Sequence, residues 1–144
     1  MESRVGAHLV LIEGDRILLV RWAEGPVPQW TVPGGALELG ETAEECATRV
    51  VFAETGYHTR IDRVLGVFDQ YISVEERLSP GDRPLHLHQV IFTGRAISGD
   101  LTPHSNQGND RATWIELAAV PTLPRVPVVD RALTLAGHGS VLSL

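Results

Sequence analysis

The chain has 144 residues and a formal net charge of −6, and this length suits a single domain over residues 1–144 with one hydrophobic core. The negative charge argues against a nucleic-acid polymer as partner, because such binding draws on clustered cations. Cys46 is the sole cysteine and no apolar run approaches the length of a membrane span, so a cytoplasmic protein with no membrane partner is expected.

The first predicted elements are strands. Residues 5–22 are expected to form a β-hairpin, because aliphatic and β-branched residues flank the turn signal at residues 13–15. The segment from Trp30 to Gly35 is expected to form a short strand that ends in a glycine turn. Together these elements predict that the chain begins with a sheet and then reaches a turn.

A helix is predicted after the glycine turn. Thr42 offers an N-cap, and Glu45 stands three residues on, which is the spacing of a capping box. Gly56 is a residue typical of the position just past a helix, so the helix is expected to run to about Thr55.

The rest of the chain alternates strands with one more helix. Residues 61–72 and 85–97 have strand composition and are separated by an acidic loop with Pro and Gly at 74–84. Residues 112–117 predict a further short strand, and residues 128–136 have helical spacing. Strands with two helices in one domain predict an α/β or α+β fold, with helices on either face of a mixed sheet.

The glycine turn and the first helix share a long fixed spacing. Gly35 is followed by five residues, Glu41, seven residues and Arg49, and then by Glu54 and Gly56. This segment resembles the Nudix box, G-x5-E-x7-R-E-U-x-E-E-x-G-U, in which U is a bulky aliphatic residue. The resemblance implies a Nudix-like (MutT-like) αβα sandwich. It also implies hydrolysis of nucleoside diphosphates linked to another group, usually with magnesium.

The resemblance also assigns roles to residues. It implies that Glu54 and the backbone carbonyl of Gly34 hold Mg²⁺, because magnesium is a hard ion that prefers oxygen ligands. It implies that Glu41 pairs with Arg49 and braces the turn, so that Glu54, Arg49 and Glu41 form the catalytic set. Glu45 is four residues before Arg49 and competes for the same partner.

Two positions depart from the family pattern. Val50 and Ala53 stand where the box has glutamates. At about 100° per residue, Cys46, Val50, Ala53 and Tyr57 are expected on one stripe of the helix with Glu54 at its edge. The sequence therefore predicts an apolar helix face in place of an anionic one, and a magnesium ion that is weakly held by few carboxylates.

Other acids could replace the missing glutamates. Glu75 and Glu76 in the acidic loop, and Asp110 before the last strand, are the candidates, because loops at a sheet edge bring side chains to a site. The alternative for each is a solvated surface charge. Glu38 lies in the glycine turn itself and is better placed.

Substrate contacts are expected at the turn and at nearby strand ends. The candidates are Gly34, Gly35, Arg21, Trp30 and Asp110. Arg21 has the alternative of a solvated arginine at a strand end. Trp30, like Trp22, has the alternative of packing in the core or at its rim. His86 and His88 alternate on one strand face and have the spacing of transition-metal ligands, but an ordinary half-exposed strand is the favoured explanation, because no second His or Cys pair stands at a suggestive spacing.

These observations support two functions. The first is a Nudix-type hydrolase that cleaves a diphosphate bond in a small nucleotide-like molecule and is impaired by the loss of two box glutamates. The second is a binding or regulatory domain that keeps a nucleotide or ADP-ribose-like pocket without chemistry. The sequence also allows a homodimer, which is the commonest oligomer.

Overall fold

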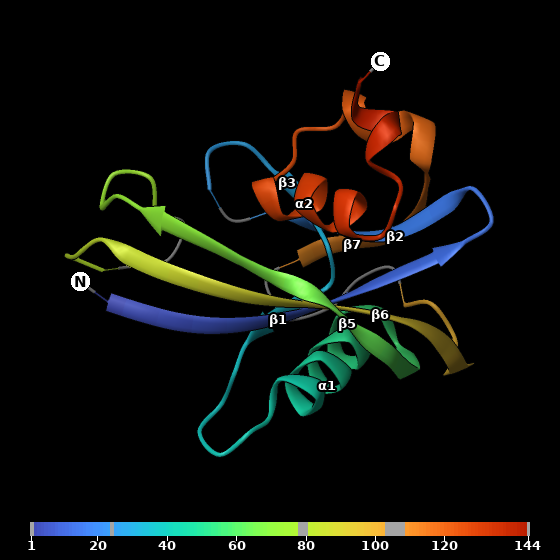
Figure 1. Cartoon of the computed structure of the whole chain (residues 1–144), viewed down its shortest axis with the longest axis horizontal. Helices are drawn as coiled ribbons and strands as arrows, with labels where there is room; N and C mark the ends of the chain where they lie inside the picture. Colours follow the sequence, from blue (N-terminus) through green and yellow to red (C-terminus); the bar gives the residue numbers. More distant parts are fainter. Residues whose placement is uncertain (1, 24, 78–80, 103–108, 144) are drawn as a thin grey trace.

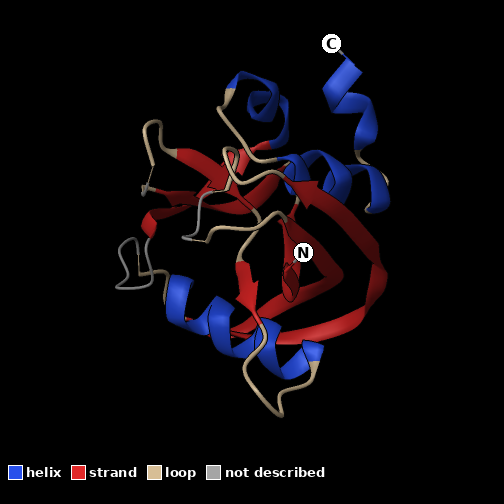
Figure 2. Cartoon of the chain, turned by 90° about the vertical axis from the view of Figure 1, so that its left-hand side faces the viewer, coloured by secondary structure: helices blue, strands red, loops and turns tan. Residues whose placement is uncertain are grey.

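The structure is a computed structural model, and it describes residues 2–23, 25–77, 81–102 and 109–143. The described residues form a mixed sheet of seven strands that lies between helix α1 (Ala43–Thr55) and helix α2 (Pro127–Leu135) (Figure 1). The view turned by 90° shows the strand layer with α1 on one side and the C-terminal helices on the other (Figure 2). The predicted α/β sandwich is therefore confirmed.

The strands, in chain order, are β1 (Glu2–Glu13), β2 (Arg16–Trp22), β3 (Gln29–Thr31), β4 (Gly34–Ala36), β5 (Tyr57–Ile72), β6 (Leu85–Gly99) and β7 (Asn109–Glu116). Two short 3₁₀ helices follow them, η1 (Leu117–Thr122) and η2 (Gly139–Ser143). The order across the sheet is β3-β2-β1-β6-β5, while β4 pairs with β1 and β7 pairs with β2. Only β1 and β6 run parallel among these pairs.

The predicted hairpin of β1 and β2 is present, but its ladder is short. The two strands pair only at Ile12 with Ile17 and at Glu13 with Arg16, beside the turn. Beyond the turn the strands part, since β1 pairs with β6 and β4 while β2 pairs with β3 and β7. This divergence opens the sheet where β4 is inserted against β1.

Several predicted elements differ from the structure in their bounds. β5 begins at Tyr57, four residues before the expected start, because Gly56 ends α1 and the chain enters the strand at once. The strand expected over residues 30–35 is divided into β3 and β4. The division falls at Pro33, which has no N–H to give to a ladder, and whose carbonyl accepts the N–H of Leu9 at 3.0 Å. The two 3₁₀ helices were not predicted.

Each helix covers its own hydrophobic cluster. The cluster under α1 consists of Ala7, Leu9, Leu11, Leu18, Cys46, Ala47, Val50, Val51 and Phe92. The cluster under α2 consists of Val10, Ile17, Leu19, Trp30, Val32, Ile91, Leu117, Val120, Val128, Val129, Ala132 and Leu133. Neighbouring residues of β1 alternate between these clusters, as the period of two in a strand requires. Among the described residues, no helix has the length and apolar character that crossing a bilayer would need.

Both ends of α1 are as predicted. Thr42 accepts the N–H of Glu45 at 3.1 Å, while the carboxylate of Glu45 accepts the N–H of Thr42 at 3.0 Å, which completes the capping box. Gly56 adopts a left-handed conformation with φ of 86° and donates its N–H to Phe52 at 2.8 Å. The helix therefore begins and ends at fixed points relative to the glycine turn.

Strand β4 lies against β1 in a contact that only glycine permits. Gly34 pairs with His8, and a Cβ atom built on Gly34 would stand 2.2 Å from the carbonyl oxygen of Ala7 and 2.7 Å from the Cα atom of His8. Both neighbours are backbone atoms, which cannot move away as a flexible side chain could. The absence of a side chain at Gly34 thus fixes how closely the glycine turn approaches the sheet.

We therefore expect Gly34→Ala to lower the free energy of unfolding by about 3 kcal/mol, because overpacking against backbone forces the strands apart. Gly14→Ala is the control, since a Cβ atom there meets nothing within 4 Å and the left-handed backbone costs only about 1–2 kcal/mol. Urea denaturation of the two variants measures the difference. Equal losses of unfolding free energy in the two variants would show that β4 can lie this close to β1 even with a Cβ atom at position 34.

Candidate functional site

Glu54 places a carboxyl group inside the protein. It lies in the last turn of α1 with 3% of its surface exposed, and its Oε1 accepts the backbone N–H of Gly34 at 2.9 Å. Burial raises the pKa of Glu54 to about 8, and the hydrogen bond from Gly34 only partly offsets this effect. The structure thus brings Glu54 beside Gly34 through a hydrogen bond, and their shared binding of magnesium stays a prediction; with this pKa the carboxyl is predominantly protonated at neutral pH.

The surroundings of Glu54 on α1 are apolar. The buried residues of the helix are Cys46, Ala47, Val50, Val51, Glu54 and Thr55. Val50 is 8% exposed and packs on the turn, since a Cβ atom at Gly35 would stand 3.3 Å from its Cγ1. The predicted stripe is wrong in two respects, because Ala53 faces solvent and Glu54 lies within the buried face rather than at its edge. The helix is therefore rotated about its own axis so that Ala53 points away from the core.

Arg49 and Glu41 form the predicted brace across the turn. Arg49 donates from Nε to Oε2 of Glu41 at 2.6 Å and from Nη2 to Oε1 at 3.0 Å, a bidentate pair. Arg49 also reaches the carbonyl of Ala36 at 3.3 Å, and Glu41 accepts the N–H of Glu38 at 3.0 Å. These bonds, that from Arg49 foremost, lower the pKa of Glu41 to about 2. The brace is therefore charged at any ordinary pH.

The acids near this brace have different partners from those expected. Glu45 was predicted to compete for Arg49, but its carboxylate is held by the capping box with Thr42. Glu38 adds a longer contact of 3.6 Å to Nη1 of Arg49 from an exposed position. The competition therefore does not occur, because the first turn of the helix satisfies Glu45 locally.

A buried pair on the α2 face was not found by sequence reasoning. His8 and Gln89 are 7% and 6% exposed. The ring of His8 donates from Nδ1 to the carbonyl of Val32 at 3.0 Å, so its Nε2 accepts the side-chain N–H of Gln89, also at 3.0 Å. Burial lowers the pKa of His8, which keeps the ring neutral. The signal available in the sequence was one polar residue within or beside an apolar run of a strand, His8 in β1 and Gln89 in β6.

The predicted substrate contacts on β2 and β3 lie together. Arg21 pairs with Trp30 across the strands, and its guanidinium carbon stands 6.0 Å from the centre of the indole ring. Trp30 is 7% exposed and belongs to the α2 cluster, in line with the alternative of core packing. Its contact with a substrate stays a prediction. Asp110 falls within β7, where its side chain lies outside the described part of the structure.

Two further groups lie away from the turn. Glu75 and Glu76 follow β5, beside the end of the sheet where Ile72 pairs with Leu85. Leu85 in turn pairs with Glu2 of β1. Gly34 pairs with His8 of the same strand, six residues or about 20 Å further along it. Glu76 there accepts a hydrogen bond from Ser73 at 2.7 Å, so the structure does not bring these acids to the turn.

His86 and His88 lie on β6 beside Asp69 of β5, and they form a separate cluster. The alternation of the two histidines on one strand was read correctly from the sequence. Asp69 was not connected with them, because its place opposite His88 depends on strand register.

Comparisons with known proteins agree with this geometry. A family model described as NUDIX domain matches residues 2–135. The chain is 30% identical over 128 residues to an ADP-ribose pyrophosphatase of Methanocaldococcus jannaschii. This match covers 88% of this chain and 68% of that protein. It is 40% identical over 62 residues to a MutT-like protein of Streptomyces ambofaciens, which covers 43% of this chain and 39% of that protein, so the chain spans about two fifths of that relative.

A solved structure, the NUDIX hydrolase from Nitrosomonas europaea, matches with a TM-score of 0.79 at 22% sequence identity. The match covers 96% of this chain and 90% of that one. At this level of identity the likeness concerns the fold.

The buried carboxyl of Glu54 predicts an unusual pH dependence of stability. Its pKa is about 8 in the folded protein and near 4.5 when exposed. Its contribution is therefore complete below pH 4.5 and is lost as the pH rises to about 8, because in this range the exposed carboxyl of the unfolded chain ionises while the buried carboxyl of the folded state keeps its proton. The stability of the wild type relative to Glu54→Gln should fall by roughly 3–5 kcal/mol across this range.

Urea denaturation of both proteins in chelator, at several pH values, measures this difference. Glu41 and His8 titrate in both proteins, so their contributions cancel in the comparison. Parallel stability curves for the two proteins would contradict the burial of an uncharged Glu54.

Proposed function

Because the chain belongs to the NUDIX domain family over residues 2–135, we propose that it hydrolyses a diphosphate bond in a small nucleoside diphosphate derivative, with magnesium as cofactor. The observation that carries the proposal is the carboxyl of Glu54 held 2.9 Å from the N–H of Gly34. It supports the proposal because it joins an oxygen ligand to a glycine turn that phosphate can approach. The pyrophosphatase name of the relative from Methanocaldococcus jannaschii supports the same class of reaction.

The residues at the turn fit one magnesium ion. Magnesium is often held by one or two protein carboxylates, with water and substrate phosphates as its other ligands. Glu54 and the carbonyl of Gly34 would be its protein ligands. Burial raises the pKa of Glu54, and a bound cation would favour its ionised form. When bound, the ion would offset the phosphate charge that repels an attacking water.

The other residues of the turn position the substrate in this proposal. Gly34 and Gly35 lie in β4 and carry no side chain, so a phosphate group can approach their backbone closely. Arg49 and Glu41 keep the turn in place, since their bidentate bonds link α1 to the segment after β4. Arg21, on the neighbouring β2, is proposed to contact the diphosphate through its planar guanidinium.

A specific observation favours the alternative of a binding or regulatory domain. Val50 is buried against Gly35, and Ala53 carries no carboxylate, so two oxygen ligands of the family pattern are missing from the helix. A diphosphate could still bind the turn without being cleaved. Release of phosphate or nucleoside monophosphate from a panel that includes ADP-ribose, with and without chelator, distinguishes the two functions.

We expect Glu54→Gln to abolish magnesium-dependent turnover while the protein stays folded. Glutamine keeps the size and can still accept the N–H of Gly34, but it cannot lose a proton to give the charge that a hard cation requires. A loss of at least about 10²-fold is expected from removing a group of this kind. Glu45→Gln is the matched control, because it makes the same change on the same helix and keeps the capping box. An unchanged rate in Glu54→Gln would remove this residue from the site.

The two missing carboxylates can be put back. We expect Val50→Glu with Ala53→Glu to tighten magnesium binding and to raise turnover on at least one substrate of the panel. In chelator, Val50→Glu should cost about 2 kcal/mol or more, because it buries a carboxylate against Gly35, whereas exposed Ala53→Glu should change stability by less than about 0.5 kcal/mol. Magnesium should restore the stability of the double variant, since it binds the folded state preferentially.

Thermal melts with and without magnesium, run beside the activity panel, measure both effects. If the double variant showed neither a magnesium-dependent shift of the melting temperature nor a gain in turnover, the binding-domain function would be favoured.

A further inference from the structure

A second cluster of metal-ligating side chains lies on the pair formed by β5 and β6. Asp69, His86 and His88 each offer one ligand atom, and these atoms all lie within 4.8 Å of one another. His88 stands directly opposite Asp69 in the ladder, and His86 is two residues away on the same face of β6. The positions are therefore set by the register of an antiparallel strand pair, which is a rigid support for a binding site.

The three side chains are only partly satisfied by one another. Nδ1 of His88 and Oδ1 of Asp69 are 2.7 Å apart. Nε2 of His86 is shielded from solvent and has no hydrogen-bond partner among the described residues. The ring of His86 is held between that of Tyr71, at 4.0 Å, and that of His88, at 3.9 Å. A buried polar atom without a partner is costly, and a metal ion would satisfy it.

We propose that Asp69, His86 and His88 bind a divalent transition-metal ion such as zinc. Two imidazoles with one carboxylate suit zinc and similar ions, whereas magnesium prefers oxygen ligands alone. Ligand atoms around a tetrahedral zinc ion stand about 3.3 Å apart, because the Zn–N distance is about 2.0 Å. The observed spacing needs a contraction that side-chain rotation supplies. Three protein ligands leave a fourth position open for water or a small ligand.

The cluster is open to solvent. It lies on the same face of the sheet as α1, since His86 and His88 alternate in step with Phe92 of the α1 cluster. On this face Val5 and Val67, which flank the cluster, are exposed. The strands here extend past the end of α1, which leaves the face uncovered (Figure 1). An ion can therefore approach the cluster from this face, and binding to Nε2 of His86 requires a movement of the side chains that shield this atom.

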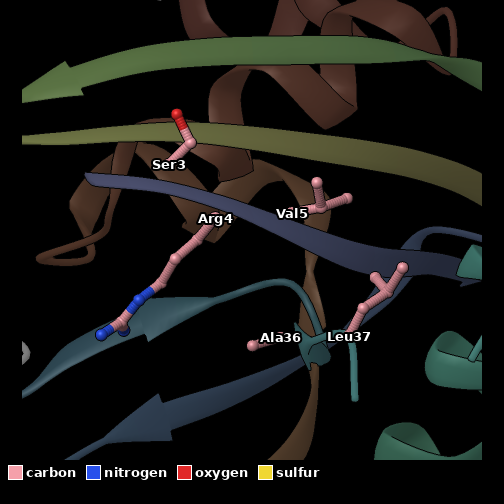
Figure 3. A pocket seen from close by; sticks show the side chains of 5 residues that line it. All are labelled: Ser3, Arg4, Val5, Ala36 and Leu37. Atoms are coloured by element: carbon pink, nitrogen blue, oxygen red, sulfur yellow. The ribbon is translucent and has the colours of Figure 1, made fainter. Parts of the chain in front are cut away.

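This cluster is separate from the glycine turn. His88 pairs with Val5 of β1, and Gly34 pairs with His8 three residues further along β1, which is about 10 Å of strand. β4 lies on the other edge of β1 from β6, two strand spacings or about 10 Å away. Figure 3 shows a hollow beside β1 that is lined by Ser3, Arg4, Val5, Ala36 and Leu37, in which Ser3 and Val5 point to one side of β1 and Arg4 to the other. An ion at one site cannot share ligands with the other.

The test is a zinc titration of tag-free protein that has first been freed of metal with a chelator. Isothermal titration calorimetry should show one zinc ion bound per chain, and zinc should raise the melting temperature, because it binds the folded state. His88→Ala and Asp69→Asn should each weaken binding at least about tenfold, since even residues behind the ligands of metal sites contribute that much. Cobalt gives a second readout through its visible absorption band, which should weaken in the same variants.

Two controls make the result specific. His58→Ala removes an exposed histidine of β5 that stacks on Phe52 and lies outside the cluster, so zinc affinity should not change. Glu54→Gln should leave zinc affinity unchanged as well, which separates this site from the proposed magnesium site whether or not the latter is active. The inference is overturned if wild-type protein shows no saturable binding. It is equally overturned if His88→Ala binds zinc as the wild type does, or if Glu54→Gln alone abolishes binding.

Discussion

The hydrogen bond from the N–H of Gly34 to the carboxyl of Glu54 joins the turn after β3 to the helix that follows it. A carboxyl buried among apolar side chains is tolerated only when it is hydrogen-bonded or neutral. At a pH near 7 the carboxyl of Glu54 is both hydrogen-bonded and uncharged. The bond requires β4 to lie close against β1, and that approach in turn requires glycine. The position of Gly35 beneath Val50 follows from the same contact. One polar group thus sets the geometry of the whole turn.

The charges of the turn are divided between its rim and its interior. At the rim, Glu41 and Arg49 form a bidentate pair that stays ionised, since each lies where water can still reach it. In the interior, Val50 stands where the family pattern has a glutamate, and its apolar contacts with Gly35 stabilise the protein. More carboxylates there would repel one another unless a cation were bound.

The two proposed metal sites differ in chemistry because they are built on different elements. The turn supplies oxygen atoms, from Glu54 and from backbone, and so suits a hard ion. The β5–β6 pair supplies imidazole nitrogens from His86 and His88 with Asp69 beside them, and so suits an ion of the zinc type. Strand β1 separates the two, and this separation allows each ion to bind without changing the ligands of the other.

The sequence by itself determined the elements whose signals are local. The capping box at Thr42, the end of α1 at Gly56 and the pairing of Arg49 with Glu41 were all correct, because spacing along the chain decides them. The tertiary structure alone decided which face of α1 is buried, since burial depends on where β4 and the sheet lie. That is why Ala53 was wrongly assigned to the buried stripe. It also decided that Asp69 stands beside His88 and Gln89 beside His8, because register joins residues far apart in the chain, and no local pattern encodes it.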